Sequence, residues 1–89
     1  MAYIIIKKTW KCDKNFVKIS DGIELIESHD RYMRATIHFK KVTNEIRDSM
    51  GKTTVNEYNL GDDLIYTING EYEIIDIIFT DARNVIKYL

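Results

Sequence analysis

Apolar and polar residues alternate over several parts of this chain, and the alternation is the main guide to its secondary structure. Successive side chains of a strand point to opposite faces, so a period of two predicts strands with one buried face. The segment 2–11 is the first of these, with Ile4, Ile6 and Trp10 on one face. The segment 53–60 follows the same rule. The pattern therefore indicates a β-rich fold.

The most regular alternation lies in the segment 31–41, which we predict to be a strand. The predicted core side consists of Met33, Ala35, Ile37 and Phe39. The predicted solvent side consists of Tyr32, Arg34, Thr36, His38 and Lys40.

Two dipeptides predict tight hairpin turns, because glycine adopts a positive φ without steric cost. Asp21-Gly22 separates the short runs 15–20 and 23–28, and Asn69-Gly70 separates two longer apolar-rich runs. A two-residue turn at the second site would pair Ile68 with Glu71, Tyr66 with Glu73 and Leu64 with Ile75.

Helical signals are confined to two short segments. In the segment 44–50, Thr43 is suited to cap the N-terminus and Gly51 to end the helix. In the segment 81–89 the apolar residues recur at helical spacing after Thr80, which predicts a helix, although a closing strand over 85–89 fits the same residues.

Composition supports a single small domain over residues 1–89. The chain is 45% hydrophobic and contains no proline, so it has enough apolar surface for one modest core. Its 15 isoleucines against four leucines favour strands, because a β-branched side chain packs well on a pleated surface. We therefore predict a mainly β fold, with α+β as the alternative: a small antiparallel sheet or barrel with one or two short helices.

One resemblance to a known architecture covers about the last third of the chain. Gly61-Asp62, the Asn69-Gly70 hairpin and the apolar run 72–79 resemble the strand–turn–strand order of SH3-like small barrels. The resemblance implies that the segment 85–89 is a strand. It implies no functional residues, since such barrels bind proteins, peptides and nucleic acids alike.

No motif for catalysis or metal binding accompanies this pattern. The only cysteine and histidines are Cys12, His29 and His38, and their spacing predicts neither a Cys–His catalytic pair nor a four-ligand zinc site. Glu71 and Glu73 would share one strand face, but no nucleophile or cofactor motif accompanies them. We therefore expect no catalytic residues, no metal ligands and no cofactor.

The expected compartment follows from the same few residues. A lone cysteine cannot form an internal disulfide, which favours a reducing cytoplasm, or the host cytoplasm for a viral protein. The order of apolar and basic residues at the N-terminus is the reverse of that in a signal peptide, and the apolar runs are too short to span a membrane.

The formal net charge of −1 conceals a segregation of charge along the chain. Residues 1–18 and 31–52 are basic, whereas residues 19–30 and 53–89 are acidic. Clustered carboxylates can imitate a phosphate backbone and attract a basic partner. The predicted protein-binding surface is an acidic hairpin that consists of Asp62, Asp63, Tyr66, Glu71, Glu73 and Asp76.

A second surface is basic and aromatic. Interleaved basic and aromatic side chains on one strand face can hold phosphates and stack a base. The predicted nucleic-acid surface on the segment 31–41 consists of Tyr32, Arg34, His38, Lys40 and Lys41. The ordinary alternative is that this is the solvated face of a strand.

Three functional hypotheses remain open from the sequence. The first is a non-enzymatic protein that binds a macromolecular partner, for example a phage-encoded inhibitor or modulator of a host protein, with a protein partner favoured over nucleic acid. The second is a nucleic-acid-binding small barrel. The third is a small-ligand binder or a small enzyme. Isoleucine-rich strands without protective prolines also favour a homodimer that covers a sheet edge.

Overall fold

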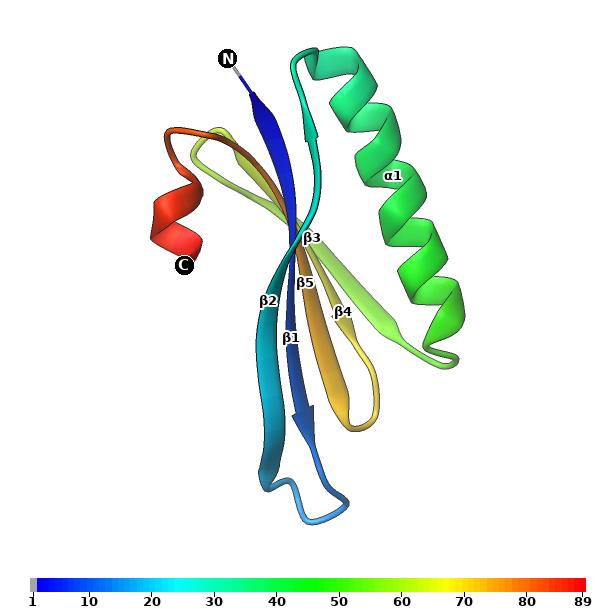
Figure 1. Cartoon of the computed structure of the whole chain (residues 1–89). Coiled ribbons are helices and arrows are strands. Elements are labelled where there is room, and N and C mark those ends of the chain that lie inside the picture. The colour runs from blue at the N-terminus through cyan, green and yellow to red at the C-terminus, as the bar shows by residue number, and fades with distance from the viewer. Residues whose placement is uncertain (1) are drawn as a thin grey trace.

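The computed structural model describes residues 2–89, so only Met1 of the predicted domain lies outside the described residues. Five antiparallel strands form one sheet, an 18-residue helix lies on one of its faces, and a short 3-10 helix lies on the other (Figure 1). The mainly β fold is as predicted. The elements are β1 (Tyr3–Cys12), β2 (Lys18–His29), α1 (Tyr32–Ser49), β3 (Thr54–Leu60), β4 (Asp63–Asn69), β5 (Glu73–Asp81) and η1 (Val85–Tyr88).

The sheet is open rather than closed. Its strand order is β2-β1-β5-β4-β3, so β2 and β3 are its two edges and do not pair with each other. A barrel would require that pairing, and the resemblance to SH3-like barrels is therefore not supported. The segment 85–88, which that resemblance implied to be a strand, forms the 3-10 helix η1.

The first predicted strand is confirmed together with its faces. Ile4, Ile6 and Trp10 share a face of β1, where Ile6 and Trp10 lie opposite Ile78 and Ile74 of β5. The other face of β1 includes Ile5, which packs with residues of α1. Both faces of this interior strand are therefore used for packing.

The predicted strand over 31–41 is wrong, because this segment is the first half of α1. The predicted helix over 44–50 is the second half of the same element. Of the four residues expected in the core, Ala35 and Phe39 are buried, whereas Met33 is 73% and Ile37 is 63% exposed. A spacing of four residues is one turn of helix, and Thr43 continues it as the next buried position.

The pattern beyond residue 41 explains why the helix forms. Val42, Ile46 and Met50 pack against the same core as Ala35 and Phe39, so the apolar stripe keeps a helical period over the whole segment 35–50. This segment contains neither glycine nor proline that would interrupt a helix. Gly51, with a φ of 79°, follows the helix as expected.

The predicted hairpin at Asp21-Gly22 is also wrong. β2 runs without interruption through both residues, and Gly22 lies opposite Thr9 of β1. The chain reverses earlier, where the Asp13 carboxylate accepts hydrogen bonds from the backbone N–H of Asn15 (2.8 Å) and of Val17 (3.0 Å). Such a local bond from an aspartate side chain mimics a backbone turn and sets the reversal.

The hairpin at Asn69-Gly70 is confirmed, but its predicted register is wrong. β4 and β5 pair Asn69 with Ile74 and Ile68 with Ile75, and the Gly70 N–H donates to the Glu73 carbonyl at 2.8 Å, so the turn lies at Glu71-Tyr72, two residues later than predicted. The predicted register would have set Glu71 against Ile68, which is fully buried. Burying a carboxylate there is costly, and the shifted turn keeps both glutamates at the end of the hairpin.

Two apolar clusters lie on opposite faces of the sheet. The larger cluster lies between the sheet and α1, and its buried members are Ile5, Ala35, Phe39, Ile68, Ile75, Ile77 and Phe79. The smaller cluster consists of Ile6, Ile65 and Ile78 and is covered by Val85 and Tyr88 of η1. The predicted helix over 81–89 is thus reduced to η1, and Thr80, its predicted cap, is a residue of β5.

Candidate functional site

The six residues of the predicted acidic surface do not lie together. Asp62 and Asp63 lie at the turn between β3 and β4, whereas Glu71 and Glu73 lie at the opposite end of β4, roughly 20 Å away. Tyr66 lies on the sheet face that packs against α1. Alternation along β5 places Asp76 on the opposite face from Ile75 and Ile77. Folding therefore disperses this surface.

Asp63 is buried, with only 2% of its surface exposed. Its carboxylate accepts hydrogen bonds from the Thr80 hydroxyl (2.8 Å) and the Tyr88 hydroxyl, and it pairs with the Lys87 ammonium (2.8 Å). Burial works to raise the pKa of Asp63, but its bonds with Lys87, Tyr88 and Thr80 outweigh burial and lower that pKa. This carboxylate ties η1 to the sheet and is not part of an exposed surface.

The remaining acidic residues of the set have ordinary local partners. Glu73 pairs with Lys11 at 3.8 Å, and Asp76 accepts a hydrogen bond from the Thr67 hydroxyl at 2.6 Å. Glu71 is exposed in the hairpin connection. Binding of a partner by these residues stays a prediction.

The predicted nucleic-acid surface is divided as well, because its residues lie on a helix and not on a strand. Arg34 and His38 line one hollow with Arg31, whereas Tyr32 and Lys40 line another hollow with Glu57 and Tyr66. The Tyr32 ring also makes edge contacts with the rings of Tyr3 and Phe79. A ring held in this way is less available to stack on a base.

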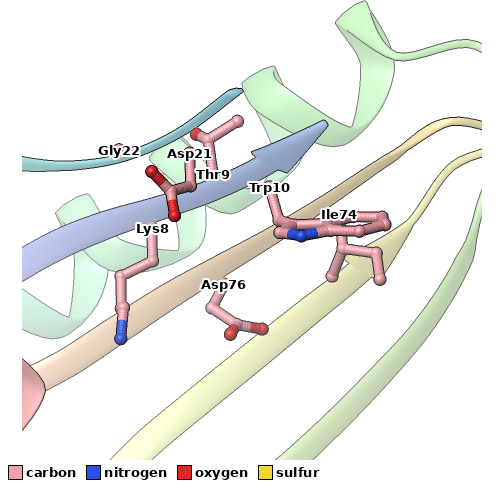
Figure 2. Close-up of a pocket in the computed structure, with 7 residues that line it drawn as sticks. All are labelled: Lys8, Thr9, Trp10, Asp21, Gly22, Ile74 and Asp76. Carbon is pink, nitrogen blue, oxygen red and sulfur yellow. The ribbon is translucent and has the colours of Figure 1, made fainter. Parts of the chain in front are cut away.

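The face of the sheet opposite α1 is only partly covered. η1 covers the cluster around Ile6, whereas the hollow beside Trp10 is lined only by described residues of β1, β2 and β5. Here Lys8, Thr9, Trp10, Asp21, Gly22, Ile74 and Asp76 line a shallow hollow of about 300 Å³. Figure 2 shows the Trp10 indole beside Ile74, with Lys8 and the carboxylates of Asp21 and Asp76 around the hollow.

Apolar side chains extend this surface onto the edge strand β2. Ile23 lies opposite Lys8 and Leu25 lies opposite Ile6, so both belong to the face opposite α1. Leu25 is 63% and Ile23 is 44% exposed, and Ile74 beside Trp10 is 36% exposed. We call Trp10, Ile23, Leu25 and Ile74 the Trp10 face. An uncovered antiparallel sheet face is normally polar, so these four residues are its distinctive feature.

The structure also brings together two histidines and a carboxylate. Glu27 and His29 are two residues apart on β2 and so share a face, and His38 of α1 lies next to them. One Glu27 oxygen, Oε2, lies 2.8 Å from His29 Nε2 and 2.9 Å from His38 Nδ1. The bond with His29, together with the bond and charge of His38, outweighs burial and lowers the pKa of Glu27. We call these residues the Glu27–His cluster.

Sequence reasoning missed both of these features. It left Trp10 in the core and left Ile23 and Leu25 without a role, because it placed a turn at Asp21-Gly22. It did not connect His29 and His38 with Glu27: it weighed them as ligands or partners together with Cys12, which is buried at the far end of β1, and placed His38 in the nucleic-acid surface. The alternate spacing of Glu27 and His29 was a usable signal, since it puts both side chains on one strand face.

Comparisons with known proteins add no information on function to the geometry described above. No family model, curated protein or solved structure matches the chain. In the described part of the chain, residues 2–89, no helix has the length and apolar character needed to cross a membrane.

Proposed function

We propose that this protein acts by binding another protein through the Trp10 face. The observation that supports the proposal is a tryptophan flanked by exposed isoleucine and leucine side chains, on a part of the sheet face that no element within residues 2–89 covers. Tryptophan is enriched among the residues that dominate binding energy, and large apolar side chains form the centre of protein interfaces. No catalytic constellation accompanies this surface, so the proposed activity is binding.

The charges around the hollow suggest the chemistry of the partner. Asp21 and Asp76 contribute two carboxylates to the hollow and Lys8 contributes one ammonium, and Lys18 pairs with Asp21 at 2.9 Å. A partner surface with an apolar centre and basic side chains at its rim would complement this arrangement.

This proposal retains part of the surface expected from the sequence. Asp76 remains at the site, whereas the buried Asp63 is excluded and Asp62 lies near the opposite end of the sheet. The negative charge that attracts the partner then comes from β2 and β5 together. Nucleic acid is the less favoured partner, because carboxylates beside the tryptophan would repel phosphates.

Trp10 is the only tryptophan, so its fluorescence reports directly on this surface. The experiment selects binders from a displayed random-peptide library on the immobilised protein and then titrates the selected synthetic peptides. We expect selected peptides to combine aromatic or aliphatic residues with Lys or Arg, and to change the emission of Trp10. Leu25→Lys should abolish this binding, because it places a charge in the apolar part of the face.

Met33→Lys provides the matched control, because Met33 is an exposed apolar residue on α1, away from the Trp10 face. Peptides that bind Leu25→Lys as well as the unchanged protein would overturn the proposal. A salt-sensitive response of Trp10 to single-stranded oligonucleotides, without peptide binding, would replace it with the nucleic-acid alternative. Concentration-dependent dimers that change the Trp10 emission would show that the face is covered by a second copy of the chain.

A further inference from the structure

The Glu27–His cluster has the ligand set of a transition-metal site. Two imidazole nitrogens and one carboxylate oxygen, from Glu27, His29 and His38, all lie within 4.8 Å of one another. Histidine nitrogen and carboxylate oxygen bind zinc at about 2.0–2.2 Å, which places ligand atoms about 3.4 Å apart around a tetrahedral ion. Small side-chain movements would therefore allow all three atoms to contact one ion.

The backbone holds these ligands in place from two separate elements. Glu27 and His29 lie on β2, where they are paired with Ile5 and Tyr3 of the central strand β1. His38 lies one position before Phe39, which is buried against the sheet. The three side chains are 34%, 15% and 38% exposed, so an ion can reach them from solvent while the backbone around them is held by the core.

From this geometry we propose that Glu27, His29 and His38 form a binding site for one divalent transition-metal ion, with Zn²⁺ as the best match. Two histidines and one carboxylate are a recurrent ligand set for zinc and for other first-row metals. Three protein ligands leave a coordination position for water or an exogenous ligand, as in catalytic rather than structural zinc sites.

Neighbouring charges affect the strength of this site. Arg31 and Arg34 line the same hollow as His38, and their positive charge opposes a divalent cation. With three ligands and this opposing charge, we expect an exchangeable ion rather than one required for folding. Cys12 lies at the other end of β1, so the site has no thiolate ligand.

The experiment uses the tag-free, chelator-treated protein and titrates it with Zn²⁺ by calorimetry and with Co²⁺ by visible absorption. We expect one ion per chain and visible absorption bands of bound Co²⁺ without a thiolate charge-transfer band. The single substitutions His38→Ala, His29→Ala and Glu27→Gln should each weaken Zn²⁺ binding by at least about tenfold. Losing a residue that only hydrogen-bonds to a metal ligand already weakens metal affinity by about that factor, and these residues would be ligands themselves.

Glu24→Gln is the matched control, because Glu24 is an exposed carboxylate on the same strand that is not part of the cluster. His38 lies on the helix surface, so its substitution tests the site with little risk to folding, and circular dichroism verifies the fold of each variant. Zn²⁺ binding that is absent, or that survives His38→Ala and Glu27→Gln unchanged, would show that the cluster is a hydrogen-bond network only.

Discussion

Replacing Asp63 by alanine tests whether this buried carboxylate joins η1 to the sheet. The substitution removes the acceptor shared by the Thr80 hydroxyl, the Tyr88 hydroxyl and the Lys87 ammonium. Removing one partner of a buried ion pair costs about 3–5 kcal/mol. Lys87 is 45% exposed and can recover water, so we expect the lower end, about 3 kcal/mol.

That loss is large for a chain of this size, whose free energy of unfolding is about 5–15 kcal/mol. Urea denaturation followed by circular dichroism measures it directly, and the melting temperature should fall by about 12–24 °C. Tyr88→Phe removes one charge-assisted hydrogen bond and should cost about 1.5–3 kcal/mol. Lys87→Met leaves the buried Asp63 carboxylate without its counter-charge and should also cost about 3 kcal/mol.

Asp62→Ala is the control, because Asp62 is the exposed neighbour of Asp63 in the sequence. Surface substitutions of this kind change stability by about 0.5 kcal/mol or less. Equal effects of Asp62→Ala and Asp63→Ala would refute the assigned role of the buried carboxylate.

Further predictions concern acid stability, the helix and two glycines. Folding lowers the pKa of Asp63, so the stability that its ionised form contributes is present above the unfolded pKa of 3.8 and is lost as the pH falls through the folded pKa. Asp63→Asn should therefore reduce the dependence of the unfolding free energy on pH between about pH 5 and pH 2, as measured by urea denaturation. Phe39→Ala should lower the unfolding free energy by about 3–5 kcal/mol because Phe39 is buried, and Ile37→Ala by about 0.5 kcal/mol or less because Ile37 is exposed. Similar losses for the two variants in urea denaturation would contradict a helix over this segment. Gly61→Ala should destabilise the protein by about 1 kcal/mol, because Gly61 has a φ of 64°. Gly22→Ala should stabilise it by about 0.5 kcal/mol, because Gly22 lies in a strand and an added Cβ meets nothing within 4 Å. If thermal melts gave the reverse order, they would support a turn at Asp21-Gly22.

The sequence was most informative where apolar alternation and turn residues agreed. β1 and the hairpin at Asn69-Gly70 satisfied both criteria and were predicted correctly as elements. The segment 31–41 failed because Ala35 and Phe39 fit a period of two and a helical period equally well. Only the apolar residues beyond position 41 distinguish a strand from a helix, and the predicted segment ended at Lys41, before these residues.

The candidate sites were less predictable, because they depend on contacts between distant segments. Asp62 and Asp63 are adjacent acids, and only the positions of Lys87 and Tyr88 make one of them buried. Similarly, His38 reaches Glu27 only because the segment that contains it is a helix packed beside β2. Charge segregation along the chain therefore predicted the sign of each segment but not a contiguous surface.

The strand order has a consequence for how the protein folds. β1 and β5 are the first and last strands of the chain, yet they are neighbours at the centre of the sheet, where Tyr3 pairs with Asp81. The hairpins β1–β2 and β4–β5 form from local contacts, but joining them closes a loop that contains most of the chain. Closing this loop costs conformational entropy before the apolar contacts between β1 and β5 form. We therefore expect the pairing of β1 with β5 to limit the folding rate. During synthesis the sheet cannot be completed until β5 has left the ribosome, and until then β1 has β2 as a partner but lacks its second partner strand.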